Sequence, residues 1–246
     1  VRSGDLDGDG VPEVVAGGEN WRFYAYRADG TPLWNYESVH PSRAGAVADL
    51  DGDGKDEVLC GTHYYWCTAL NGDGTKRWSY SFGPICYDVA TGAFDGDTKR
   101  GVILGGGDGY VHYLSAEGKL RMKYNTGDEV KSVLAADAAA DGKDEIFAGS
   151  LSHYVYRFGP DGKRRWAVDL GSPIRAVRAA KTADSRFRLV AGTETGRVVL
   201  LGGDGAILAA SDLGQAVVDL LTDRDTVLVA TEDGRLRRLK VEATGP

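Results

Sequence analysis

Cysteine is scarce in this chain. There are three cysteines among 246 residues (Cys60, Cys67 and Cys86), which is too few for a scaffold held together by disulfides. Cys60 and Cys67 flank one predicted hairpin turn, where either a disulfide or two buried free thiols would fit. The fold must therefore depend on a hydrophobic core rather than on cross-links.

Long apolar runs and excess positive charge are also missing. No run approaches the roughly 18 apolar residues of a membrane-spanning helix, so we expect no membrane insertion. Lys and Arg number 29 against 36 Asp and Glu, a net charge of −7, which argues against a nucleic-acid partner. No methionine or signal peptide begins the chain, so we expect a mature or excised piece of something longer.

Glycine, by contrast, is abundant. The chain has 35 glycines, about twice the usual share and without the period of collagen. Glycine at this level indicates many tight turns and hence many short strands. Hydrophobic residues make up 42% and charged residues 26%, which excludes a disordered chain.

Two markers recur along the chain in one register. Apolar runs occur at Val14–Gly18, Val58–Thr62, Val102–Gly106, Ile146–Ser150, Leu189–Thr193 and Val227–Thr231, in steps of 44, 44, 44, 43 and 38 residues. An acidic residue and a glycine recur at Asp29-Gly30, Asp73-Gly74, Glu117-Gly118, Asp161-Gly162 and Asp204-Gly205. Four residues after these glycines come Trp34, Trp78, Met122, Trp166 and Ala209, and we expect the tryptophans to be docking residues of the core.

Each repeat contains four strand-like runs and no sustained helical periodicity. In the second copy they cover residues 44–50, 57–62, 65–70 and 76–82. Four strands in each repeat of this length indicate the blade of a β-propeller. We predict an all-β, six-bladed propeller of four-stranded antiparallel blades in a single domain, 1–246. The predicted blades cover residues 1–38, 39–82, 83–126, 127–170, 171–212 and 213–246.

The closure of the propeller is less regular than its blades. Residues 241–246 are too short and too polar for a good fourth strand, so the last blade is incomplete. We expect one ring of six blades with imperfect closure. The alternative is an open arrangement, part of a ring of seven or eight blades.

Two segments carry a family resemblance. Asp5–Glu13 and Asp49–Glu57 resemble the calcium loops of FG-GAP (VCBS-type, integrin-α-like) propeller repeats. The segment Ala69–Trp78 is similar to PQQ-like propeller repeats, whose last strand carries a docking tryptophan. The resemblance implies a propeller with calcium loops, but it says little about function, because such propellers serve adhesion, sugar binding, scaffolding and catalysis.

The carboxylates of these two loops suit calcium. Calcium takes six to eight oxygen ligands, and carboxylates at loop positions 1, 3, 5 and 9 with a carbonyl at position 7 point at one centre. The predicted ligands are Asp5, Asp7, Asp9, the carbonyl of Val11 and Glu13 in the first loop, and Asp49, Asp51, Asp53, the carbonyl of Lys55 and Glu57 in the second. An EF-hand would need glutamate at position 12, where Ala16 and Cys60 stand. Zinc is disfavoured because the loops lack His and Cys. We expect two Ca²⁺ ions that pin the hairpins of the first two blades.

The later copies lose these carboxylates. The fourth keeps Asp137, Asp141 and Glu145, so a third Ca²⁺ ion is possible there. The third keeps two carboxylates, the fifth begins with Lys181, and the sixth is shortened. We expect these three loops to be empty.

Aromatic residues replace turn glycines on the opposite face. The turns between the second and third strands end in glycine in copies three, five and six, but in Trp21, Tyr65 and His153 in copies one, two and four. Such an exchange gives up easy backbone geometry for ring surface. The rings could form a platform that stacks against sugars or a partner's side chains, or they could pack within longer turns.

A second pattern lies at the start of the first strand of each blade. Arg43, Tyr87, Lys131 and Arg175 share one register position there. They could ring the mouth of the channel and hold an anion. Alternatively, they are solvated or paired with neighbouring acids such as Asp88, Asp128, Glu129 and Asp219, and this alternative is favoured.

The resulting functional hypothesis is a non-catalytic, calcium-binding adhesion or binding module, monomeric or part of a larger chain. Its partner would be a glycan or a protein that docks on the face opposite the calcium loops, and calcium loops suggest an extracellular or cell-envelope location. The alternatives are the propeller domain of a polysaccharide-active enzyme and a purely structural module of a surface protein. Against an enzyme, the repeat leaves only about five residues per connection, and no catalytic spacing of residues is present.

Overall fold

The protein is built from antiparallel sheets. The computed structural model describes residues 1–96, 98–181 and 186–241, and these residues form 23 strands and no helix. No part of this described chain is therefore a helix able to cross a membrane. The strands form six sheets in chain order, five with four strands and the last with three.

The strands follow one another as a simple meander within each sheet. Their bounds are β1 Arg2–Gly4, β2 Glu13–Gly17, β3 Arg22–Tyr26, β4 Pro32–Glu37, β5 Ser42–Ala48, β6 Glu57–Thr62, β7 Trp66–Leu70, β8 Lys76–Ser81, β9 Cys86–Gly92, β10 Gly101–Gly106, β11 Tyr110–Leu114, β12 Leu120–Asn125, β13 Val130–Ala136, β14 Glu145–Ser150, β15 Tyr154–Phe158, β16 Arg164–Asp169, β17 Ile174–Lys181, β18 Phe187–Thr193, β19 Arg197–Gly202, β20 Ile207–Asp212, β21 Val217–Asp223, β22 Thr226–Thr231 and β23 Leu236–Lys240. Every sheet falls inside one of the predicted blade ranges, and the prediction of six blades is confirmed.

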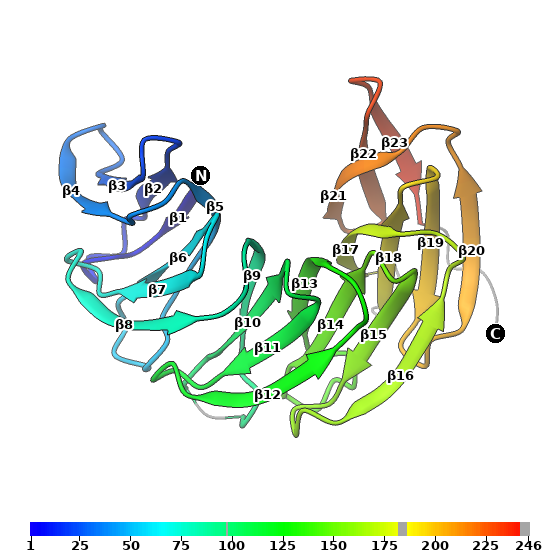
Figure 1. Cartoon of the computed structure of the whole chain (residues 1–246), viewed down its shortest axis with the longest axis horizontal. Coiled ribbons are helices and arrows are strands. Elements are labelled where there is room, and N and C mark those ends of the chain that lie inside the picture. The colour runs from blue at the N-terminus through cyan, green and yellow to red at the C-terminus, as the bar shows by residue number, and fades with distance from the viewer. Residues whose placement is uncertain (97, 182–185, 242–246) are drawn as a thin grey trace.

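The six blades are arranged in an arc (Figure 1). The innermost strand of each blade packs beside that of the next, β1 on β5 and so on to β17 on β21. In Figure 1 the first blade and the last blade lie on opposite sides of a wide gap. The expected ring closure is therefore wrong for the described residues, and the open alternative is the observed one. The physical reason is that no contact comparable to those between neighbouring blades joins β21 to β1 among them. Residues 242–246, where a weak final strand was considered, lie outside the described residues.

The core consists of separate layers between adjacent blades. Each of five buried apolar clusters combines residues of two neighbouring blades. The second strands of blades two, three and four (β6, β10 and β14) are buried along their whole length. The corresponding strands of the end blades, β2 and β22, alternate between buried and partly exposed residues, because only one of their faces meets another blade.

The tryptophans dock each blade onto the next, as predicted. The indole N–H groups of Trp34, Trp78 and Trp166 donate to backbone carbonyls of the following blade, at 2.8, 2.8 and 3.0 Å. The carbonyls belong to Gly72, Ala116 and Gly203, in the turn between the third and fourth strands.

The three cysteines are free and buried. The predicted proximity of Cys60 and Cys67 does not take the form of a cross-strand pair, because Cys60 lies opposite Thr68 and Cys67 lies opposite Gly61. The alternative of free buried thiols is the one observed.

Candidate metal loops and ligand face

The first carboxylate loop joins β1 to β2. Asp5 accepts hydrogen bonds from the backbone N–H groups of Gly8 and Gly10, both at 2.8 Å. These glycines have φ of 83° and 84°, a region that side chains disfavour, and the turn therefore wraps around the carboxylate. Asp5, Asp7 and Glu13 each present an oxygen within 4.8 Å of the others. Asp9 stays outside this cluster and accepts from the N–H of its own turn.

The second loop, between β5 and β6, repeats this geometry. Asp49 accepts from the N–H groups of Gly52 and Gly54 at 2.7 and 3.0 Å. The oxygens that lie within 4.8 Å of one another here come from Asp49, Asp51 and Asp53. Among the residues that the structure describes, these two loops hold the clusters of three carboxylates, which are the oxygen ligands that calcium prefers.

The two loops are joined across the blade boundary. The N–H of Asp5 donates to the carboxylate of Asp56 at 2.8 Å, and the N–H of Asp56 donates to the carbonyl of Asp5 at 2.7 Å. A change in one loop is therefore transmitted directly to the other.

A buried glutamate closes both loops from below. Glu13 and Glu57 are each 2% exposed and accept the backbone N–H of Leu6 and Leu50, both at 2.9 Å. Burial raises the pKa of Glu57 from 4.5 to about 7, although the Leu50 N–H and the charge of Arg77 act in the opposite direction.

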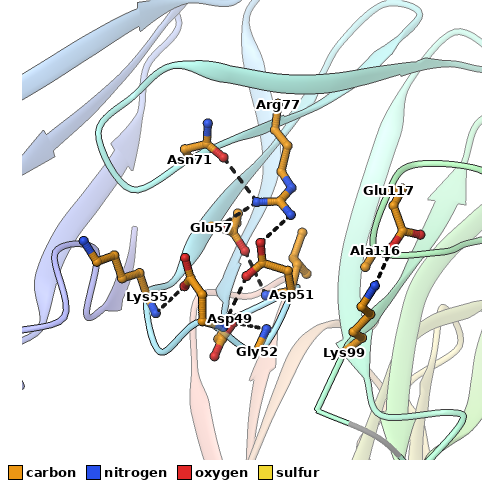
Figure 2. Close-up of polar contacts among 12 residues, drawn as sticks. Asp49, Asp51, Gly52, Lys55, Glu57, Asn71, Arg77, Lys99, Ala116 and Glu117 are labelled. Carbon is orange, nitrogen blue, oxygen red and sulfur yellow. Dashed lines mark hydrogen bonds and ion pairs between the residues drawn. The ribbon is translucent and has the colours of Figure 1, made fainter.

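Arg77 on β8 enters the second loop, which the sequence reasoning missed. Its guanidinium lies 2.5 Å from Asp51 and 3.4 Å from Glu57, and it also donates to the side-chain oxygen of Asn71 at 3.3 Å (Figure 2). The hydrogen bond from Arg77 holds the pKa of Asp51 below its usual value. The available signal was positional: Arg77 directly precedes the docking Trp78, whereas Leu33 precedes Trp34 in the first blade.

The fourth loop is arranged differently. Asp137 accepts the N–H groups of Asp141 and Gly142 at 3.0 and 2.9 Å, as in the first two loops. Glu145, however, is paired with Arg157. Within the described part of the chain, Asp137, Asp141 and Glu145 do not form a cluster of the kind seen in the first two loops. The third and fifth loops include residues 97 and 182–185, which lie outside the described residues.

The three aromatic residues on the other face occupy strained turn positions. Trp21, Tyr65 and His153 have φ of 64°, 65° and 76°. Glycines hold the equivalent positions in the remaining blades: Gly109, Gly196 and Gly234, with φ of 78°, 91° and 75°. The predicted exchange of backbone ease for ring surface is thus visible in the backbone itself.

Trp21 and Tyr65 come together in one exposed group of rings. The members of this aromatic patch are Trp21, His40, His63, Tyr64 and Tyr65. The ring of His40 lies 6.4 Å from those of both Trp21 and Tyr65 and 5.2 Å from that of Tyr64. Trp21 and Tyr65 are 51% and 55% exposed, so packing accounts for only part of their surface.

The two histidines of the patch were not predicted to belong to it. His40 lies in the connection between the first two blades, on the same face as the turns that carry Trp21 and Tyr65. Only the folded topology brings this connection beside those turns. His153, on the fourth blade, makes no ring contact with the patch among the ring pairs of the described residues.

The cations at the channel mouth are paired, as the favoured alternative expected. Arg43 lies 3.3 Å from Glu19, and Arg175 lies 3.2 Å from Glu194. Lys131 is paired with Glu129 and also lies 3.3 Å from the centre of the Tyr87 ring. Arg43 additionally donates to His63 at 2.8 Å, which places it at the edge of the aromatic patch.

Comparisons with known proteins agree with this architecture. A family profile described as an FG-GAP-like repeat matches residues 5–60. The profile of the lambda-carrageenase beta-propeller domain matches residues 46–132. A PQQ repeat profile described as outer membrane protein assembly factor BamB matches residues 151–245. The chain is built from FG-GAP-type propeller repeats with PQQ-like elements.

Solved structures share the propeller fold at low identity. BBS1N, crystallised in complex with ARL6DN, is 16% identical with a TM-score of 0.70, over 96% of this chain and 76% of that one. Sqt1 of Saccharomyces cerevisiae is 13% identical with a TM-score of 0.77, over 95% and 69%. The V. cholerae biofilm matrix protein Bap1 is 20% identical with a TM-score of 0.65, over 86% of this chain and 38% of its own. Among curated proteins, no sequence matches this chain.

Proposed function

We propose that this propeller is a non-catalytic, extracellular or cell-envelope binding module whose aromatic patch stacks against the sugar rings of a glycan. The observation that carries the proposal is the pair Trp21 and Tyr65. Both adopt a positive φ where other blades use glycine, and both remain more than half exposed. A non-glycine residue at such a φ costs of order 1 kcal/mol or more, which intramolecular packing of half-exposed rings repays poorly.

The chemistry of the patch suits a carbohydrate. Exposed rings offer flat apolar faces, and each aromatic contact contributes about 0.5–1.5 kcal/mol beyond area burial. Arg43 and Glu19 at its edge supply charged hydrogen-bonding groups. A protein partner is the competing occupant, since tyrosine, tryptophan and arginine also dominate protein interfaces.

Calcium is the second part of the proposal. The clustered oxygens of Asp5, Asp7 and Glu13 and of Asp49, Asp51 and Asp53 fit a hard cation. The ion would neutralise the repulsion among the carboxylates and hold the hairpin, while the loop glycines and Asp56 keep the backbone in place. Its role would be structural, on the face of the propeller opposite the patch.

A polysaccharide-active enzyme remains the second candidate, because the lambda-carrageenase propeller profile matches residues 46–132. The module would then hold substrate for a catalytic site elsewhere. Incubation of the protein with sulfated galactans and polyuronides, followed by analysis of chain length, tests for catalysis by this chain.

The binding proposal is tested on a glycan array with calcium present. Replacing Trp21 and Tyr65 by glycine removes both rings and relieves the strained φ. The double variant should therefore lose glycan binding while its melting temperature stays equal or rises. His153→Gly is the matched control, because it removes a ring at the same turn position outside the patch and should leave binding intact.

If the wild type binds no glycan but captures a protein through Trp21 and Tyr65, the partner class is wrong. If the double variant binds glycans as the wild type does, the patch is not the binding surface.

A further inference from the structure

Three loops of this chain place a buried glutamate at the same position. Glu13, Glu57 and Glu145 are 2%, 2% and 6% exposed. A buried carboxylate is costly unless a cation or several hydrogen bonds compensate it. The charge that compensates each glutamate therefore shows what each loop needs from outside.

The cationic partner differs from loop to loop. Glu145 is paired with Arg157, and Glu57 lies 3.4 Å from Arg77. Glu13 forms no ion pair with any other described residue, although it faces Asp5 and Asp7. Its one hydrogen bond here comes from the N–H of Leu6. The first loop thus holds a buried carboxylate without a resident cation, whereas the other two supply their own.

Arg77 competes for oxygens that calcium would need. Its guanidinium lies 2.5 Å from Asp51, one of the clustered ligands, and also reaches Glu57 (Figure 2). Calcium requires contact with charged oxygens at about 2.3–2.6 Å, so a guanidinium and the ion cannot share them. In the first loop the nearest arginine, Arg27, lies 3.7 Å from Asp7, and both side chains are more than 40% exposed.

We propose that Arg77 is a built-in competitor of calcium in the second loop, so that the first loop fills before the second. This inference rests on the proposed calcium loops. Leu33 stands at the position of Arg77 in the first blade and carries no charge, which leaves that loop open to the ion. Arg157 on Glu145 is the end of the same series, a loop in which an arginine takes the place of the ion.

The surroundings allow Arg77 to yield. A hollow of about 480 Å³ lies between the first two blades, lined by side chains that include Arg77, Asp7, Asp53, Asp73 and Asn71. A displaced guanidinium can move into this hollow and remain near the carboxylate of Asp73. Arg77 therefore lowers the calcium affinity of the second loop without abolishing binding.

Calorimetric titration of the metal-free protein with calcium chloride tests the proposal. The wild type should show two steps that differ about tenfold or more in affinity, the size expected from losing one partly buried charge pair. Arg77→Leu, which copies the first blade, should strengthen the weaker step about tenfold and leave the stronger one unchanged. Arg27→Leu, the matched control, should not change the weaker step.

Two further variants assign the steps. Asp7→Asn should remove the stronger step and keep the weaker, and Arg77→Leu in that background should strengthen the step that remains. If Arg77→Leu does not fold without calcium, Arg77→Gln replaces it, because it keeps a hydrogen-bonding side chain without the charge.

The outcomes separate the two proposals. If no variant binds calcium, the calcium part of the proposed function is wrong. If the two steps are equal and Arg77→Leu or Arg77→Gln changes neither, calcium binding stands and the role of Arg77 is overturned.

Discussion

Leu33 and Arg77 occupy one position in two successive blades, directly before the docking tryptophan. In a regular repeat, such a pair of residues meets nearly the same surroundings, so a difference between them isolates the side chain. Here the leucine belongs to the loop without an internal cation, and the arginine reaches into the loop of its own blade. Register therefore identifies which residue to compare, while only the folded contacts show which carboxylates it meets.

Glu57 gives a pH dependence with a defined sign. Its pKa is raised from 4.5 to about 7 by burial, so the folded protein holds a proton that the unfolded chain releases. The stability from this group is complete below pH 4.5 and is lost as the pH rises to about 7, in total roughly 3 kcal/mol. In EDTA, Glu57→Gln should therefore remove a fall in stability between these two pH values, measured by urea denaturation.

Glu117 is the control with the opposite sign. Its pKa is lowered to about 2 by hydrogen bonds from Ser115 and Lys99, so its contribution is present above pH 4.5 and is lost as the pH falls towards 2. Glu117→Gln should leave the interval from 4.5 to 7 unchanged. A wild type and Glu57→Gln variant with parallel pH curves would contradict the role given to Glu57.

At the scale of the element, the tryptophan of one blade rests on a turn glycine of the next. A Cβ added to Gly74 would lie 2.7 Å from Trp34, and one added to Gly118 would lie 2.6 Å from Trp78. Both glycines also have positive φ. Each is therefore fixed twice, by its own backbone and by the ring from the preceding blade.

Gly30 separates these two requirements. It is the equivalent turn glycine of the first blade, with φ of 88°, but nothing lies within 4 Å of an added Cβ. Gly30→Ala should cost only the backbone strain, about 1–2 kcal/mol, whereas Gly118→Ala should cost a further 1–3 kcal/mol or so because the ring must shift. Urea denaturation of both variants measures the difference, and equal losses would show that the tryptophan contact does not constrain the turn.

The elements themselves could be predicted closely from the sequence. The two repeat markers place the four strands of each blade, the docking tryptophans and the hairpin glycines, because these depend on local pattern and register. The partners of long side chains could not be predicted. Arg77 and His40 act on residues of other strands or turns, and their positions depend on how the strands are brought together. The open closure also escaped prediction, because every blade looks alike in sequence whether or not the ring is complete.

The whole molecule behaves as a chain of neighbours. Each apolar cluster joins two adjacent blades, and the first and last blades lie apart (Figure 1). In arrays of this kind, stability is approximately the sum of the repeats and of the interfaces between neighbours. The end blades have one interface each and the inner blades have two, so opening should begin at the ends.

Amide hydrogen exchange of the second strand of each blade tests this picture. Each such strand, from β2 to β22, is hydrogen-bonded to a strand on either side, so differences among them report on packing between blades rather than on the sheet. In EDTA, β10 and β14 should exchange slowest and β2 and β22 fastest, because only the former are buried along their whole length. Calcium should then slow exchange in β2 and β6, which follow the two carboxylate loops, and leave β22 unchanged. Equal protection of all six strands would mean that the end blades are covered in solution, and calcium-induced protection of β22 would mean that the ion acts on the whole arc rather than on the hairpins that bind it.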